Sequence, residues 1–461
     1  MEIRNLQPSD LSAQIDRLWP LSAAKIDAID RDFDLSHGAP VFTVDGRYTA
    51  RGWTEWTQGF QFGSAILQFD ATGEARFLDL GRQRTRDLMA PHLTHFGVHD
   101  HGFNNVSTYG ALLRLAAEGR IDADPWEQEF YRLALKVSGA VQAGRWTALP
   151  EDLGYIPSFN GPHSLFIDTI RSLRALALGH RLGHVLMEEG DARVSLLARL
   201  AQHAVTTARY NIFYGDGRDI YDIRGRTAHE AIFNVRTGAY RCPSTQQGYA
   251  PFSTWTRGLA WAICGYAEQL EFLATLAAAE IAGVPHGPDL IQVVEDAARA
   301  TADFYIANSA ADGIPYWDTG APGLDRLGDW RSRPSEPLNA WEPVDSSAAA
   351  IAAQGLMRLG HHLGARGDAG ADRYMAAGLT VLATLLDTPY LCADPDHHGL
   401  ILHSQYHRPN GWDHVPAGSA IPNGEATMWG DYHAREAALY VQRLAAGAPY
   451  LAFFAIDGAA P

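Results

Sequence analysis

Cysteine is scarce in this chain of 461 residues. The three cysteines, Cys242, Cys264 and Cys392, do not form the even, closely spaced set of a disulfide framework, and no CxxC pair suggests a zinc site. Reduced thiols and a cytoplasmic location are therefore expected. The first residues show no basic segment followed by an apolar one, so we expect no signal peptide, and a periplasmic location would require one. No apolar run approaches the length that crosses a membrane.

Positive charge is also in short supply. Lys and Arg number 37 against 53 Asp and Glu, which gives a formal net charge of −16. Nucleic acids and anionic membranes select basic surfaces, so the chain is predicted to bind neither. A short anionic ligand that needs only one or two local cations stays compatible with this composition. The oligomeric state does not follow from the sequence.

Several motifs of cofactor and metal chemistry are absent. The sequence has no Walker loop, no GxGxxG after a predicted strand and no GxSxG elbow. The histidine pairs at 99 and 101, 361 and 362, and 397 and 398 lack the spacing of a helical zinc motif. We therefore predict no cofactor and no resident metal.

The sequence predicts about twelve amphipathic helices, which follow one another in hairpin-like pairs. This count and length fit an all-α protein, an (α/α)6 barrel of six helical hairpins with a small β-hairpin near 227–242 and long rim loops near 311–343 and 388–424. We predict one catalytic domain over 1–461, in which 1–50 form an N-terminal helix and an irregular extension. The helices are expected near 10–32, 53–69, 74–89, 101–118, 125–144, 164–175, 192–210, 253–280, 288–309, 344–363, 372–388 and 425–444.

Asp100 lies between His99 and His101, just before a predicted helix. Aspartate is a preferred N-cap residue, so capping alone would explain it. The two flanking imidazoles favour a functional role instead, because they could donate hydrogen bonds or hold a water molecule. We therefore also expect His99 to contact a ligand.

Asp168 lies in an apolar run that is expected to be helical, between Leu165–Ile167 and Ile170. Apolar surroundings raise the pKa of a carboxyl group because burial disfavours its charged form. A carboxylic acid that stays protonated near neutral pH can serve as a general acid. The alternative is a salt bridge to Arg171 or Arg174.

Arg257 and Trp261 are four residues apart, so they share one face of a predicted helix. Tryptophan offers an apolar plate for a sugar ring, and arginine offers a planar fork for a carboxylate. The alternative is a buried tryptophan covered by the arginine stem. Aromatic residues near Trp56 and in the late loops, such as Trp412, fit carbohydrate binding at a rim or the anchoring of loops.

Together these motifs resemble the unsaturated glucuronyl hydrolases, glycoside hydrolase family 88, over about Trp53 to Ala438. Each motif is short, and the resemblance depends on their common order and spacing. They are W-T-x-G-F (56–60), H-D-x-G-F (99–103), I-D-x-x-x-x-L (167–173), Q-G-Y (247–249), W-x-R-G-x-A-W (255–261), D-S-S-A-A-A-I-A-A (345–353), H-S-x-Y-H-R-P (403–409) and M-W-G-D-Y (428–432).

The resemblance implies an (α/α)6 barrel and assigns roles to particular residues. Asp168 falls on the general acid/base, and Asp100 on a second essential carboxylate that binds ring hydroxyls and organises the site. Trp56 falls on a stacking position. The remaining implied substrate-binding residues are His229, Gln247, Arg257 and Trp261.

The implied substrate is a small oligosaccharide, most simply a disaccharide, with a 4,5-unsaturated uronic acid at its non-reducing end. The implied reaction protonates C4 of the vinyl ether and adds water at C5, and the resulting hemiketal opens and releases the next sugar. One departure is Gln246, where the family pattern has histidine. Three alternatives stay open: an unsaturated rhamnogalacturonyl hydrolase acting on pectic fragments, a direct inverting glycosidase using Asp100 and Asp168, and a barrel that only binds oligosaccharide.

Overall fold

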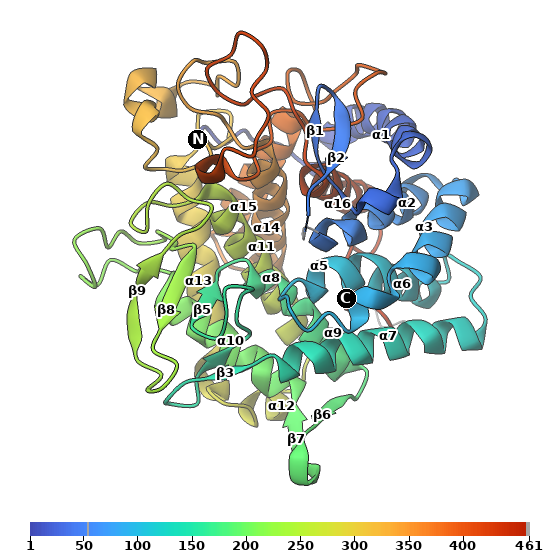
Figure 1. Cartoon of the computed structure of the whole chain (residues 1–461), viewed down its shortest axis with the longest axis vertical. Coiled ribbons are helices and arrows are strands. Elements are labelled where there is room, and N and C mark those ends of the chain that lie inside the picture. The colour runs from blue at the N-terminus through green and yellow to red at the C-terminus, as the bar shows by residue number, and fades with distance from the viewer. Residues whose placement is uncertain (53–54, 458–461) are drawn as a thin grey trace.

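Helices dominate the computed structural model, which describes residues 1–52 and 55–457 (Figure 1). The predicted helical segments all contain helix, although several are divided. The helices are α1 (Ser12–Asp32), α2 (Gln58–Thr72), α3 (Ala75–Leu88), α4 (Ala90–Leu93), α5 (His101–Asn105), α6 (Ala111–Ala117), α7 (Pro125–Gly144), α8 (Thr169–Ser172), α9 (Arg174–Arg181), α10 (Leu196–Asn211), α11 (Thr256–Leu273), α12 (Ala278–Ala282), α13 (Gly287–Asn308), α14 (Ser346–Ala365), α15 (Ala371–Leu385) and α16 (Met428–Ala445).

The long helices form two concentric layers of a closed ring. In the inner layer α2 packs on α5 and the turn that follows it, α5 on α8, α8 on α11, α11 on α14, α14 on α16, and α16 returns to α2. The helices α1, α3, α7, α10, α13 and α15 lie outside this layer, each against inner helices. The contact between α16 and α2 closes the ring, so the predicted (α/α)6 barrel is confirmed. None of the described helices is both long and apolar enough to cross a membrane.

The ends of several ring helices are fixed by local sequence. Asp345 caps α14 by accepting hydrogen bonds from the backbone N–H groups of Ser347 and Ala348. Thr427 caps α16 in the same way through the N–H of Gly430. Such caps satisfy N–H groups that have no partner within the helix. They place the first turns of α14 and α16 at one end of the ring, next to the long loops.

The short strands are β1 (Pro40–Val44), β2 (Arg47–Ala50), β3 (Thr147–Ala148), β4 (Gly154–Tyr155), β5 (Ser164–Phe166), β6 (Val185–Met187), β7 (Arg193–Ser195), β8 (Glu230–Phe233) and β9 (Tyr240–Ser244). β8 and β9 form the predicted hairpin, with Gly238 at a positive φ of 71° in its turn. β5 pairs with β8, Leu165 opposite Ala231, and completes a three-stranded antiparallel sheet.

This sheet corrects the prediction of one helix around Asp168. A short apolar run fits a buried strand and a buried helix equally well, and here the run forms a strand because it pairs with β8. Asp168 therefore stands after β5 and directly before the single-turn helix α8.

Two other predicted helices differ from their expected form. The helix after Asp100 is divided into α5, a π-helical turn over Val106–Gly110, and α6. The helix expected over 53–69 is regular only from Gln58, after a 3-10 turn at Glu55–Thr57. Trp53, which was expected to open this helix, lies outside the described residues.

The stretch 40–50, expected to be irregular, is instead the antiparallel hairpin β1–β2. The hairpin continues its pairing onto the late loop, because Thr43 N–H donates to the Ala426 carbonyl at 3.0 Å and Phe42 forms a bridge with Thr427. In Figure 1 the hairpin lies near the loops that precede α16. This pairing fixes the loop at the point where it enters α16.

Gly102 sets how closely α5 approaches α8. A Cβ atom at this position would lie 2.3 Å from the carbonyl oxygen of Ser172, so no larger residue fits without movement. Gly102 N–H donates to Ser172 Oγ at 2.9 Å, and Arg174 donates to the Gly102 carbonyl at 2.7 Å. Because Asp100 precedes α5 and Asp168 precedes α8, this contact brings the two aspartates together.

We expect Gly102→Ala to destabilise the protein by about 1–3 kcal/mol, because the added methyl group forces α5 and α8 apart. The measurement is the midpoint of thermal unfolding. The control is Gly144→Ala at the end of α7, where the nearest atom to an added Cβ is 3.7 Å away and no loss is expected. Equal midpoints for the two variants would contradict the role given to this contact.

Candidate active site

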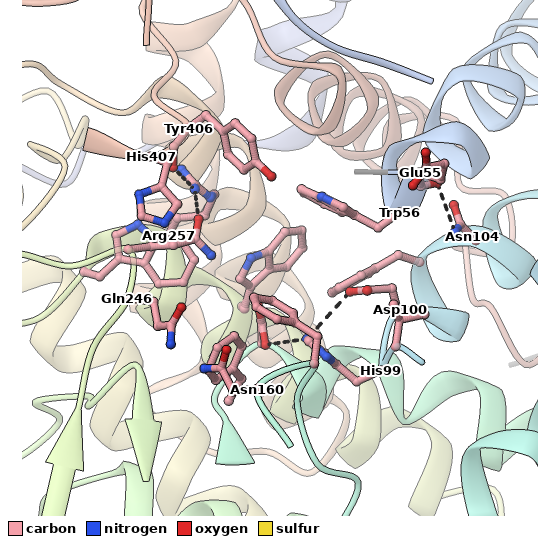
Figure 2. Close-up of a pocket in the computed structure, with 18 of the residues that line it drawn as sticks. Glu55, Trp56, His99, Asp100, Asn104, Asn160, Gln246, Arg257, Tyr406 and His407 are labelled. Atoms are coloured by element: carbon pink, nitrogen blue, oxygen red, sulfur yellow. Dashed lines mark hydrogen bonds and ion pairs between the residues drawn. The ribbon is translucent and has the colours of Figure 1, made fainter. Parts of the chain in front are cut away.

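A cavity of about 470 Å³ lies at the end of the ring where α5 and α8 begin (Figure 2). Its size is typical of a pocket for a small organic ligand. It collects seven of the eight residues predicted from the sequence. The wall consists of Glu55, Trp56, His95, Val98, His99, Asp100, Phe103, Asn104, Phe159, Asn160, Phe166, Asp168, Gln246, Gln247, Trp255, Arg257, Trp261, Tyr406, His407, Asn410 and Trp412.

Asp100 and Asp168 face the same nitrogen of His99. His99 Nε2 lies 3.3 Å from Asp168 Oδ1 and 3.7 Å from Asp100 Oδ1 (Figure 2). The side chain of His99 is 3% exposed, and those of Asp168 and Asp100 are 11% and 13% exposed. One buried imidazole therefore joins two largely buried carboxyl groups that retain a small opening to the cavity.

The local geometry excludes the two structural explanations that the sequence left open. Asp100 occupies the N-cap position of α5, but its side chain makes no capping hydrogen bond. Arg171 and Arg174 do not pair with Asp168, because both point to the buried carboxylates of Glu268 and Glu436. Both aspartates are thus directed to the cavity for reasons other than capping or charge pairing with these arginines.

The pKa values of Asp168 and Asp100, which both lie beside His99, differ from those that the sequence predicted. Burial raises the pKa of Asp168, but the charge of His99 and its hydrogen bond outweigh burial, and the net pKa is lowered. Burial raises the pKa of Asp100 against the opposing charge of His99, and the Asp168 charge raises it further. The expected raised pKa of Asp168 is therefore wrong for the ligand-free pocket, where Asp100 holds a proton more readily.

Arg257 is fully engaged by the protein. Nη1 donates to Asp345 Oδ2 at 2.9 Å and to the Gln405 carbonyl at 2.6 Å. Nη2 donates to Gln247 Oε1 at 2.8 Å and to the Tyr406 carbonyl at 2.6 Å. These four bonds use the fork that was expected to face a ligand carboxylate. The guanidinium fixes the Gln247 amide and the 405–406 backbone on the cavity wall.

His229 lies behind the wall and supports it. Its Nδ1 accepts the backbone N–H groups of Gln246 at 2.9 Å and Gln247 at 3.3 Å. Burial lowers the pKa of His229 to about 4, so the ring is neutral and carries its proton on Nε2. That atom is buried and has no hydrogen-bond partner among the described residues. His229 thus positions the 246–247 segment and keeps one donor unused.

Aromatic rings form the apolar part of the cavity. Trp56 stacks on Trp429 with ring centroids 4.9 Å apart, and Phe103 lies 4.8 Å from Trp261. Trp261 is only 2% exposed, so it forms the floor of the cavity and not an open platform. Trp412, from the late loop, also reaches the wall.

Other wall residues were not predicted from the sequence. Phe159 and Asn160 precede β5, and His407 and Asn410 belong to the late loop. His407 falls in the H-S-x-Y-H-R-P motif, which was a usable signal. Phe159 and Asn160 lie in an irregular segment, and Asn410 ends a single 3-10 turn, Arg408–Asn410. None of these segments has a periodic pattern, so only the folded chain brings the three residues to the cavity.

Comparisons with known proteins agree with this architecture, although no protein-family model matches the chain. The unsaturated glucuronyl hydrolase of Bacillus sp. strain GL1 is 26% identical over 404 residues, covering 86% of this chain and 89% of that protein. That of Formosa agariphila is 25% identical over 392 residues, covering 85% and 80%. The solved structure of the Bacillus sp. GL1 enzyme superposes with a TM-score of 0.69 at 22% identity, covering 94% of this chain and 97% of that one.

Over most of its length the chain is similar in sequence and fold to unsaturated glucuronyl hydrolases. The unsaturated chondroitin disaccharide hydrolase of Streptococcus pyogenes is a further relative, 25% identical over 445 residues, covering 94% and 92%. The family resemblance noted in the motifs is therefore confirmed over almost the whole chain. The roles of individual residues stay predictions.

The shared imidazole leads to a prediction about proton binding. Burial lowers the pKa of His99, but Asp100 and Asp168 raise it more, so its net pKa lies above the usual value. We expect Asp168→Asn to lower the pKa of His99, because one of the two stabilising charges is removed. The measurement is an NMR titration of labelled histidine side chains. His403, whose pKa burial lowers to about 4 without a contribution from Asp168, is the internal reference. An unchanged His99 pKa would contradict the shared site.

Proposed function

We propose that this chain is a glycoside hydrolase that removes a 4,5-unsaturated uronic acid from the non-reducing end of small oligosaccharides. The observation that carries the proposal is the pair of buried carboxyl groups on one imidazole, at the base of a cavity with aromatic walls. The names of the relatives support it, since two are unsaturated glucuronyl hydrolases and one is an unsaturated chondroitin disaccharide hydrolase.

In the proposed reaction a protonated Asp168 donates to C4 of the vinyl ether, and positive charge develops at C5 and the ring oxygen. Water then adds at C5 and gives its proton to the Asp168 carboxylate, which restores the acid. The hemiketal at C5 opens and releases the neighbouring sugar. His99 stabilises negative charge on Asp168 through its Nε2 atom. Asp100 contacts the same Nε2 atom, so both residues act beside Asp168 in the reaction.

The ligand itself supplies the condition for Asp168 to act as an acid. In the empty pocket Asp168 favours its charged form. A bound uronate brings a negative charge into the same buried space, and a like charge raises the pKa of a neighbouring carboxyl group. Substrate binding therefore shifts the proton equilibrium toward protonated Asp168.

The geometry gives less support to a direct inverting glycosidase. Such enzymes hold their two carboxyl groups on opposite faces of the sugar with a water molecule between one of them and the ring. Here Asp100 and Asp168 converge on one nitrogen atom, so they approach a ligand from the same side. A pectic substrate with the same unsaturated end would use the same chemistry and is distinguished by a substrate panel.

We expect Asp168→Asn to lower kcat by roughly 10²–10⁴-fold or more with little change in KM, because it removes proton transfer and keeps the shape of the side chain. The assay follows the loss of ultraviolet absorbance of unsaturated disaccharides derived from chondroitin, gellan, xanthan and pectin. Asp79→Asn, an exposed position on α3, is the matched control. Full activity in Asp168→Asn would exclude the assigned role, and cleavage confined to saturated glycosides would exclude the reaction.

The pH dependence of the reaction should show whether the charge of the bound substrate raises the pKa of Asp168. The profile of kcat/KM reports the free enzyme, and that of kcat reports the complex. Because the acid form of Asp168 is required and its pKa rises on binding, activity is lost as pH increases, and the loss in kcat should occur at higher pH than the loss in kcat/KM. Coincident basic limbs, measured on the same disaccharide, would mean that the substrate does not tune this carboxyl group.

A further inference from the structure

Three donor side chains from separate segments meet outside the active-site cavity. Asp45 is in the turn between β1 and β2, His414 is in the late loop, and Glu425 precedes α16. One ligand atom from each lies within 4.8 Å of the others, and His414 Nε2 is 3.3 Å from Asp45 Oδ1. Two carboxylates and one imidazole form a mixed nitrogen and oxygen donor set.

Two of the three donors are held by rigid backbone. Asp45 and Gly46 both have positive φ, 47° and 74°, as a two-residue hairpin turn requires. Glu425 is adjacent to Ala426, which is paired with Thr43 of β1 through two hydrogen bonds. Gly46 N–H also donates to Glu425 Oε2 at 3.3 Å. The hairpin turn and Glu425 are therefore fixed relative to each other before any ion binds.

His397 orients the Glu425 carboxylate. Its Nδ1 accepts the backbone N–H of Gly399 at 2.9 Å, so the neutral ring carries its proton on Nε2. That nitrogen is 3.6 Å from Glu425 Oε2 and makes no hydrogen bond of good geometry within the described residues. His397 is thus suited to hold the carboxylate through a long N–H contact, and its tautomer excludes it as a ligand through Nε2.

We propose that Asp45, His414 and Glu425 bind one divalent transition-metal ion of the zinc class, with water completing the coordination. Imidazole favours zinc over calcium or magnesium, and carboxylate oxygens are accepted zinc ligands. The ion would neutralise two negative charges in a protein of net charge −16. The three ligands are far apart in the sequence, which explains why no metal motif is visible there.

The position of His414 connects this site to the cavity. His414 follows Asp413, whose carboxylate accepts the backbone N–H groups of Tyr406 and of His407, the latter at 3.0 Å. Tyr406, His407 and Trp412 all line the cavity. A metal ion on His414 would tie this loop to the β1–β2 hairpin and restrict its movement. The consequence for substrate affinity rests on the proposed function, but metal binding does not.

The test uses the full-length protein, stripped with a chelator and titrated with zinc chloride by calorimetry, with manganese and calcium chloride in parallel. We expect one zinc ion per chain, weaker binding of the other two ions, and a higher midpoint of thermal unfolding with zinc, because a ligand that binds the folded state stabilises it. No zinc binding, binding only at millimolar concentration, or preference for calcium would overturn the proposal.

Two conservative variants locate the site. Asp45→Asn keeps a residue that tolerates positive φ, and His414→Gln keeps a polar side chain of similar length. Each should weaken zinc binding by at least roughly 10-fold. Loss of a residue that only supports a metal ligand already lowers metal affinity by about 10–100-fold, and loss of the ligand itself should lower it at least as much. The control is His180→Gln, which removes another surface histidine, paired with Glu280 at 3.2 Å, and should leave zinc affinity unchanged.

The same variants separate a metal site from a simple ion pair. If Asp45 and His414 only pair with each other, each substitution lowers the unfolding midpoint equally with and without zinc, and this outcome would overturn the proposal. In the expected outcome the variants lose the zinc-dependent increase in the midpoint. Because calorimetry and unfolding need no substrate, the result is independent of whether the chain acts on unsaturated disaccharides.

Discussion

The active site depends on the close approach of two chain segments that are far apart in the sequence. Gly102 and Ser172 lie in direct backbone contact, and this contact brings Asp100 and Asp168 to the same nitrogen of His99. Two acids that share one imidazole cannot titrate independently. The division of protons, the orientation of both carboxyl groups and the proposed order of proton transfer all follow from this arrangement.

Beneath the cavity, buried charges hold the segment that carries Asp168. Arg171 on α8 donates to Glu268 at 3.1 Å and to Glu436 at 2.7 Å, which belong to α11 and α16. Leaving one partner of such a buried pair without the other is costly, so the network favours one arrangement of three inner helices. In the wall of the cavity, Arg257 joins α11 to the backbone of residues 405–406. Side chains outside the proposed proton transfer thus fix the segments that line the cavity.

The helices could be predicted because long amphipathic segments have a clear period, and the pairing of β8 and β9 because alternation flanks a glycine turn. Closure of the helices into a ring did not follow from the period and rested on the helix count and the family resemblance. The strand β5 could not be predicted, since a short apolar run has no period that separates strand from helix. Seven predicted site residues line one cavity. The raised pKa was wrongly predicted for Asp168, because the residues next to Asp168 in the sequence do not show that His99 lies beside it in the folded chain. Arg257 was expected to face a ligand, but three of its four protein acceptors, on Asp345, Gln405 and Tyr406, come from residues far away in the sequence. The single-domain organisation and the cytoplasmic location stay predictions.

The most direct test of the account is to run the reaction of an unsaturated disaccharide in D2O and to locate deuterium in the released acid by NMR and mass spectrometry. If Asp168 delivers a solvent-derived proton to the vinyl ether, the product of the purified protein contains one deuterium at C4, with a single configuration. A product that keeps its C4=C5 double bond, or one without deuterium at C4, would contradict hydration and would point to direct cleavage of the glycosidic bond.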